Sequence, residues 1–275
     1  MKLNRAIAGY VLAGIAMLFI FLYLRFPEEA LKNYVKAFAA SRYPGASFSI
    51  DAIRPSFPPG AVLSNVTVAF RDRPEAILHA DSLSVRPGGL ALLSGRYAIV
   101  MAAEGYGGNA EARIDFSRLL SFRGPLNAEA SVNNVRIEKC AWLREALARP
   151  ITGTLKGSIT FTGSAEALKN GTGNIEFALT NGAYPLLESF LGIQKIDFAR
   201  VEGKVAYRNG ALRINQLTLS GEKIRCSLKG NILLADHVQE SQIDLSGTIE
   251  IPGQGNRRIT LNIGGTLGNP VSRFM

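Results

Sequence analysis

Residues 201–232 read VEGKVAYRNGALRINQLTLSGEKIRCSLKGNI, and this stretch decides the fold. Val205 and Tyr207 alternate with more polar neighbours, and Asn209-Gly210 follows them directly. The same alternation resumes after this pair in Leu212 and Ile214, and again after Gly221 in Ile224, Cys226 and Leu228. A period of two gives a β-strand one apolar face, and Asn-Gly is a strong signal for a tight hairpin turn. The stretch therefore predicts consecutive antiparallel strands that share one apolar face.

The same pattern runs through the chain from residue 46 to its end. Glycine is frequent, at 28 of 275 residues, and many glycines lie in short turn-like clusters, which favours many hairpins. Asn181-Gly182 is expected to form a further turn of this kind. In the C-terminal part, the alternation predicts an apolar sheet face that is available to a lipid or to a covering helix, made by Val205, Tyr207, Leu212, Ile214, Ile224, Leu228, Ile243, Leu245, Ile259, Leu261 and Ile263.

An antiparallel sheet with one apolar face must cover that face. It can curl into a barrel, pack against a second sheet, accept helices or bind an apolar ligand, and the alternation leaves all of these open. Two short helices are expected to fold back over the sheet, one over residues 139–149 and one over 185–191, because each stretch has a proline or glycine boundary. The predicted fold is mainly β: an antiparallel sheet with a few short helices.

The N-terminus carries a different pattern. Residues 6–24 contain no charge and no proline, and as a helix they would be about 28 Å long, which is close to the thickness of the hydrocarbon core of a bilayer. A cleaved signal peptide would have a shorter apolar run and a small-x-small cleavage site, so we expect an uncleaved transmembrane anchor. The predicted organisation is a cytoplasmic stub and anchor in residues 1–26, an amphipathic helix and linker in 27–45, and the antiparallel β domain in 46–275.

The charge bears on the expected partners. The formal net charge is +9, which favours contact with anionic lipid head groups. The basic residues are spread along the strands and do not cluster with aromatic residues. Nucleic acid is therefore not an expected partner.

No motif in the sequence predicts enzyme chemistry. The two histidines and two cysteines are too far apart for a zinc site. Gly105, Gly107 and Ala110 match a GxGxxA pattern, but a strand-like stretch follows them, which indicates a hairpin. We predict no catalytic residue, no metal and no cofactor. Cys140 and Cys226 are expected to be small buried residues, although a disulfide between them stays open.

Three stretches resemble the AsmA-like family of bacterial envelope proteins. They are residues 78–100 (LHADSLSVRPGGLALLSGRYAIV), the strand–Asn-Gly–strand–Gly–strand run of 201–232, and the C-terminal GGTLGNPVSRF of 264–274. In the first and last of these, the positions that carry the resemblance are Ala80, Asp81, Leu83, Val85, Leu92, Leu93, Gly95, Gly265, Leu267 and Pro270.

The resemblance to that group implies a curved antiparallel sheet, as a half-barrel or open groove. Within that group, the size and plan resemble the protein N family of the general (type II) secretion pathway. This resemblance implies a single-pass protein of the inner membrane, with its C-terminal domain in the periplasm, that serves as a non-enzymatic component of the type II protein secretion apparatus. Membrane lipid, through the N-terminal helix, and other secretion-system proteins are the expected partners. The alternative is an AsmA-like lipid-binding or lipid-transfer protein that holds lipid in an apolar groove of the sheet. Positive charges flank residues 6–24 on both sides, so they do not settle the orientation.

Overall fold

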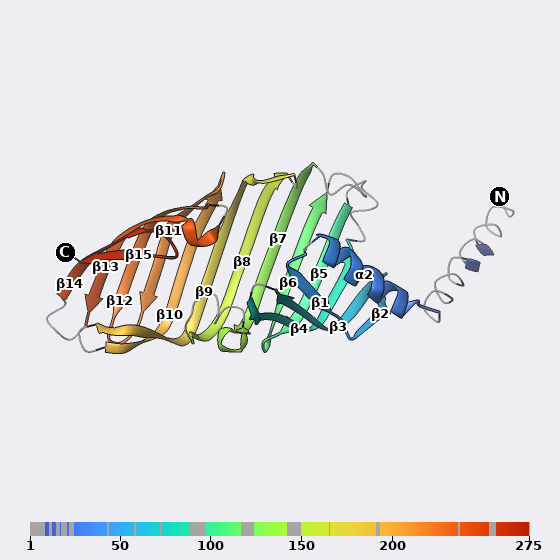
Figure 1. Cartoon of the computed structure of the whole chain (residues 1–275), viewed down its shortest axis with the longest axis horizontal. Coiled ribbons are helices and arrows are strands. Elements are labelled where there is room, and N and C mark those ends of the chain that lie inside the picture. Colours follow the sequence, from blue (N-terminus) through green and yellow to red (C-terminus); the bar gives the residue numbers. More distant parts are fainter. Residues whose placement is uncertain are drawn as a thin grey trace.

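The computed structural model describes residues 9–10, 13–14, 17, 21, 25–42, 44–57, 59–71, 73–88, 97–116, 124–141, 150–164, 166–190, 193–235, 237–252 and 257–274. These residues form one 15-stranded antiparallel sheet (Figure 1). The predicted mainly β, antiparallel fold is therefore confirmed.

Strand follows strand in chain order, so that nearly every strand pairs with the one before it and the one after it. At the N-terminal end, both β1 and β2 pair with β3. The strands are β1 (Ala46–Ser49), β2 (Ala52–Ser56), β3 (Gly60–Phe70), β4 (Arg73–Pro87), β5 (Tyr97–Gly105), β6 (Gly108–Phe116), β7 (Pro125–Arg136), β8 (Thr152–Ser164), β9 (Ala167–Phe190), β10 (Ile193–Arg208), β11 (Ala211–Ser220), β12 (Arg225–Leu233), β13 (Gln242–Ile251), β14 (Arg257–Gly265) and β15 (Pro270–Phe274).

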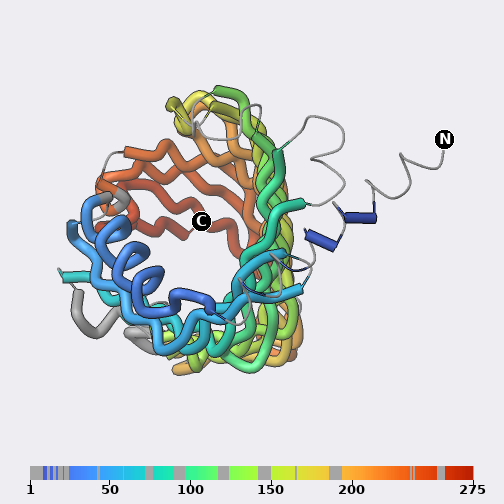
Figure 2. The backbone as a smooth tube through the Cα atoms, turned by 90° about the vertical axis from the view of Figure 1, so that its right-hand side faces the viewer, coloured from blue at the N-terminus to red at the C-terminus, as the bar shows by residue number. Residues whose placement is uncertain are grey.

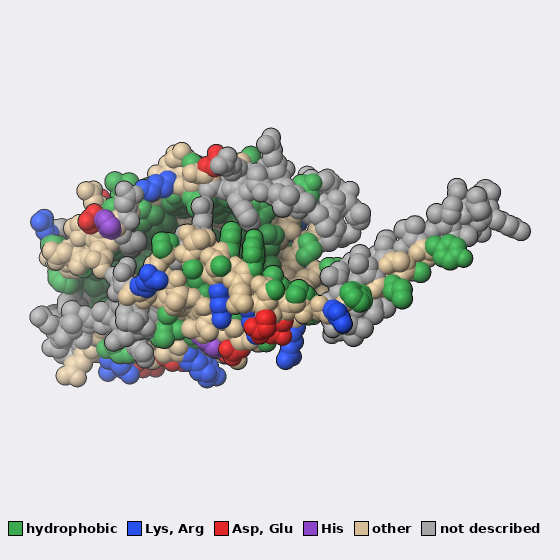
Figure 3. Space-filling view, turned by 45° about the vertical axis from the view of Figure 1, so that its right-hand side comes forward, with side chains coloured by type: hydrophobic (Ala, Val, Ile, Leu, Met, Phe, Trp, Pro, Cys, Tyr) green, Lys and Arg blue, Asp and Glu red, His purple; other side chains and the backbone are tan. Residues whose placement is uncertain are grey.

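Seen end-on, the sheet curls round on itself, as Figure 2 shows. Right-handed strand twist accumulates across a sheet of this width, and β-bulges add to it. The space-filling view in Figure 3 shows a hollow on the concave side of the sheet, with hydrophobic side chains gathered within it. We call this concave apolar surface the trough.

The structure describes helix α2 (Glu28–Arg42) and two short 3-10 turns, η1 (Ile137–Lys139) and η2 (Val238–Glu240). Helix α2 matches the helix that the sequence predicts after the apolar N-terminal run. Among the described residues, none of the helices combines the length and the apolar character that crossing a bilayer requires. The predicted anchor in residues 1–26 and the predicted helix over 139–149 lie largely outside the described part of the chain.

The predicted helix over residues 185–191 is wrong. Strand β9 continues to Phe190, and Pro185 pairs with Lys195 of β10. On its other side, β9 pairs with β8 only as far as Ala183. Since proline lacks an N–H, it is tolerated where the strand has no neighbour on that side to receive a hydrogen bond. Pro185 therefore lies just beyond the point where the pairing of β8 with β9 ends, whereas the sequence suggested the start of a helix there.

The expected turn at Asn181-Gly182 is also wrong, because both residues lie inside β9. Asn181 has a φ of 52°, and the register between β8 and β9 shifts beside it, between Thr152 and Thr154. This is a β-bulge, which bends a strand without ending it. The carbonyl oxygen of Thr152 and the ring of Phe198 occupy the space that a side chain at position 182 would need.

The turn predicted from Asn209-Gly210 is confirmed. Asn209 has a φ of 50° and Gly210 a φ of 80°, and the two residues join β10 to β11. Two positive φ angles in succession are the signature of the type I′ hairpin turn that Asn-Gly favours.

Helix α2 lies against β1 and β2 at the N-terminal end of the sheet. An Oε1 atom of Glu28 accepts a hydrogen bond from the backbone N–H of Ile53 at 3.2 Å and forms an ion pair with Lys32 at 3.0 Å. Ile53 itself is buried, with 1% of its surface exposed. The hydrogen bond from Lys32 and then the one from Ile53 hold the pKa of Glu28 below its usual value of 4.5. Glu28 thus joins the start of α2 to β2.

This contact should depend on pH. Because the pKa of Glu28 is lowered in the folded chain, its stabilising effect is complete above pH 4.5 and is lost as the pH falls below that value. We expect the amide of Ile53 to exchange faster, after correction for the intrinsic rate, as the pH drops through this range. Glu28→Gln should show faster exchange at neutral pH, and Glu29→Gln, which keeps the bond to Ile53, should not. Equal protection in all three proteins at every pH would contradict this role for Glu28.

Candidate functional site: the apolar trough

The floor of the trough is made of apolar side chains that face one another across the strands. In one row, Ile159 of β8 lies opposite Ile175 of β9, which lies opposite Val205 of β10, which lies opposite Ile214 of β11. The row continues through Gly230 and the strands beyond it. Cross-strand neighbours of this kind stand about 5 Å apart and stabilise the sheet by contact. Together they make a continuous apolar surface.

The same row reaches back to the N-terminal end of the sheet. Ile159 lies opposite Ala130 of β7, and Ala130 lies opposite Ala112 of β6. The row then passes through Met101 and Val85. The apolar floor therefore spans most of the length of the sheet and is not confined to the C-terminal strands.

The structure brings all the predicted apolar-face residues together on this floor. Those that are buried lie in two clusters, one around Ile224 and Leu261 and one around Ile214, Ile243 and Leu245. The others are partly buried and lie on the same face: Val205, Tyr207, Leu212, Leu228, Ile259 and Ile263. Both of these buried clusters thus lie in the C-terminal part of the trough.

Alternation alone missed part of the floor. Leu217 and Leu219 also face inward, although their parity differs from that of Ile214. The register of β11 shifts between Ile214 and Leu217, against both of its neighbouring strands. A bulge inserts one extra residue and so changes which residues face inward beyond it. The alternation around Ile159 and Ile175 is regular, so it was sufficient to predict that both residues face the apolar side.

No second layer covers the trough among the residues that the structure describes. Apart from α2 on β1 and β2 and η1 on β8, extensive contacts join only strands that are neighbours in the sheet. Ile159 points into the trough and still exposes 47% of its surface. A half-exposed isoleucine on a continuous apolar floor indicates a surface that is open to a ligand.

The open part of the floor contains a cavity of about 400 Å³ near the β8–β9 hairpin. Tyr207 lines one side of it, and its hydroxyl donates a hydrogen bond to the carbonyl oxygen of Lys169 at 3.1 Å. The ring of Tyr207 lies 6.1 Å, centre to centre, from that of Phe161. The side chains that line the cavity are almost all apolar: Ile159, Phe161, Leu168, Ile175, Tyr207 and Leu212.

Among the described residues, one group of polar side chains on the surface resembles a catalytic arrangement. Thr67 Oγ1 lies 3.2 Å from His79 Nδ1, and His79 Nε2 lies 3.1 Å from Asp81 Oδ1. A hydroxyl, an imidazole and a carboxylate in sequence can support nucleophilic catalysis. Here the side chains of His79 and Asp81 are 39% and 65% exposed, and none of the three residues lines the cavity in the trough. We interpret the group as a surface hydrogen-bond network.

The two cysteines do not form a disulfide with each other. Cys140 and Cys226 are both free. Cys226 faces the trough between Leu219 and Ile249, as its alternation predicts, and burial raises the pKa of its thiol. Within the described ranges, no group of three or more histidine, cysteine, aspartate or glutamate side chains could hold a metal ion.

The comparisons with known proteins add no constraint, since no family model matches the chain and no similar curated protein or solved structure was found. The family resemblance and the functions that it implies therefore stay predictions.

Proposed function

We propose that this chain is a non-enzymatic lipid-binding protein that holds hydrocarbon chains in the apolar trough. One observation carries the proposal: a continuous apolar floor crosses the sheet with no covering layer among the described residues. Such a surface would be costly to leave in contact with water. A ligand that buries it must be apolar and elongated, and an acyl chain has both properties.

The energetics support a hydrocarbon ligand. Each methylene group that leaves water contributes about 0.8 kcal/mol, so even part of one acyl chain offsets the entropy lost on binding. Polar groups within the cavity are few, and the Tyr207 hydroxyl already has a carbonyl partner. The cavity thus favours apolar length over hydrogen bonding.

The sequence supplies a source for such a ligand. The uncharged run of residues 6–24 precedes α2, which lies at the N-terminal end of the trough. A membrane anchor formed by this run would hold that end of the trough beside a bilayer. In this proposal the protein is a single-pass inner-membrane protein with its β domain in the periplasm, and it takes up lipid from the membrane beside it.

The test is the identity of what the trough contains. The full chain should be purified in a mild detergent, exchanged into a second detergent, and extracted for lipid analysis by mass spectrometry. We expect phospholipid or fatty acid to remain bound at near-stoichiometric amounts after exchange. A preparation that is free of lipid and takes up no added fatty acid would rule the proposal out.

Membership of the type II secretion apparatus stays a prediction from the sequence resemblance. No described contact or surface favours it over lipid binding. Affinity capture of the tagged chain from its own membranes, followed by identification of the associated proteins, would test it separately.

A further inference from the structure

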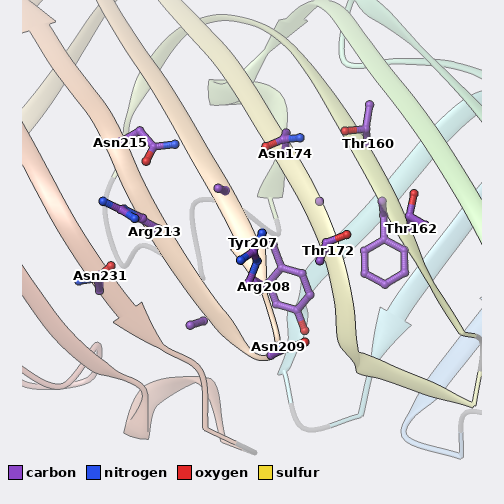
Figure 4. A pocket seen from close by; sticks show the side chains of 14 residues that line it. Thr160, Thr162, Thr172, Asn174, Tyr207, Arg208, Asn209, Arg213, Asn215 and Asn231 are labelled. Carbon is purple, nitrogen blue, oxygen red and sulfur yellow. The ribbon is translucent and has the colours of Figure 1, made fainter.

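The outer face of the sheet, opposite the trough, carries a polar hollow of about 820 Å³. Figure 4 shows its lining side chains on neighbouring strands from β8 to β12, with Arg208 near the middle. Arg213 and Asn231 lie on one side of Arg208, and Thr160 and Thr162 lie on the other (Figure 4). Most of the lining residues are the alternate residues of the strands that build the trough, and Phe161, Gly173 and Tyr207 line both the hollow and the trough cavity.

Strand register explains why these residues meet. Arg213 lies opposite Ala206 on β10 and opposite Asn231 on β12. Arg208 lies opposite Ala211 on β11 and opposite Thr172 on β9. The two arginines are therefore diagonal neighbours, about 7 Å apart at the backbone, and each has an alanine directly across from it. The short alanine side chains leave room between the guanidinium groups.

A bulge brings one more polar group into the hollow. Asn215 is the extra residue at the register shift between β10 and β11, and it lines the hollow. Bulges often redirect a side chain toward a binding site, because the inserted residue leaves the regular ladder. Amide and hydroxyl groups thus surround the arginines, and each of them can both donate and accept hydrogen bonds.

Several other arginines on this face have an acidic partner. Arg113, Arg200 and Arg258 each form an ion pair with a carboxylate. Among the described residues, neither Arg208 nor Arg213 forms an ion pair or a side-chain hydrogen bond.

Nor does any aspartate or glutamate line the hollow. The nearest acidic residues in the register are Asp244 and Glu176. Asp244 lies opposite Asn231. Glu176 follows Asn174 on the same face of β9, and its Oε1 atom lies 4.0 Å from Nζ of Lys204. Two unpaired guanidinium groups on adjacent strands repel each other, and an anion bound by both would remove that repulsion.

We infer that this hollow binds an anionic polyol, such as a sugar phosphate. Arg208 and Arg213 bind the charged group, since guanidinium forms paired hydrogen bonds with phosphate or carboxylate oxygens. The threonine and asparagine side chains around them bind the ligand's hydroxyl groups. Arg208 and Arg213 lie on the face opposite the trough, so anion binding by them does not depend on the proposed lipid binding, and either can fail without the other.

The experiment is a calorimetric titration of the full chain, in a non-ionic detergent, with glucose 1-phosphate. We expect binding that Arg208→Ala and Arg213→Ala each weaken at least about tenfold, which corresponds to one charge-assisted contact. Arg225→Ala is the matched control, because Arg225 is an exposed arginine of the same face outside the hollow. The melting temperature of each variant, measured alongside, verifies that it is folded.

The outcomes separate the two parts of the proposal. No binding of glucose 1-phosphate, or an equal loss in Arg225→Ala, would overturn the site. Inorganic phosphate binding as tightly as glucose 1-phosphate would overturn the polyol and leave only a bare anion contact. Competition with phosphatidylinositol in mixed micelles identifies the source of the ligand, since displacement supports a lipid-borne head group and retention supports a free sugar phosphate.

Discussion

Replacing Ile159 with aspartate should empty the trough while the sheet stays folded. Ile159 lies in the apolar row between Ala130 and Ile175 and lines the cavity, so an acyl chain in the trough would lie against it. A carboxylate at this point must lose its hydration when hydrocarbon covers it, which costs several kcal/mol. We expect affinity for a fluorescent fatty acid to fall at least about a hundredfold, and co-purified lipid to fall in parallel.

The 47% exposure of Ile159 makes this test specific. Aspartate at a half-exposed position remains hydrated when no ligand is bound, so we expect the melting temperature to change little. Ser158→Asp is the matched control, because Ser158 is an exposed residue of the same strand on the opposite face. Unchanged fatty acid affinity in Ile159→Asp, or equal losses in both variants, would show that hydrocarbon does not occupy the trough.

Replacing Gly230 with alanine should destabilise the C-terminal part of the sheet strongly. Gly230 has a φ of 148° and lies in the inner row between Ile214 and Leu245. A Cβ at this position would overlap the carbonyl oxygen of Asp244 and lie 2.8 Å from the Cα of Leu245. Both obstacles are backbone atoms, so β12 and β13 would have to move apart at one of the two buried clusters.

Strain and overpacking of this kind together cost on the order of 3 kcal/mol. For a chain of this size, that loss lowers the melting temperature by roughly 6–12 °C. Thermal unfolding followed by circular dichroism measures it. Gly264→Ala on β14 is the control, because the nearest atom to its added Cβ is 3.9 Å away. Equal melting temperatures for Gly230→Ala and Gly264→Ala would show that the stability of the sheet does not depend on the close approach of β12 and β13 at Gly230.

Bulges limited how far the sequence could specify the inner face. On β11, the period of two gave the correct side for Leu212 and Ile214, and beyond Ile214 the extra residue Asn215 reversed the parity of the strand. The same residue helps to form the outer hollow, which sequence reasoning did not find. Bulges depend on both paired strands, so the alternation within one strand carries no signal for them.

The two Asn-Gly pairs show the same limit. Asn209-Gly210 and Asn181-Gly182 have the same local preference for positive φ, and both asparagines adopt it. One pair closes a hairpin and the other sits inside a 24-residue strand. What differs is the surroundings, because β8 and Phe198 pack against Gly182, whereas nothing lies within 4 Å of the space beside Gly210.

The sequence by itself determined that the chain forms antiparallel strands and, between bulges, which residues share one face, because side-chain direction in a strand follows from a period of two that each segment carries alone. Only the tertiary structure decided that the strands join into one curled sheet with an open trough and that two unpaired arginines meet on its outer face. Curvature, bulges and cross-strand neighbours arise from pairing between segments, and no single segment encodes its partner's register.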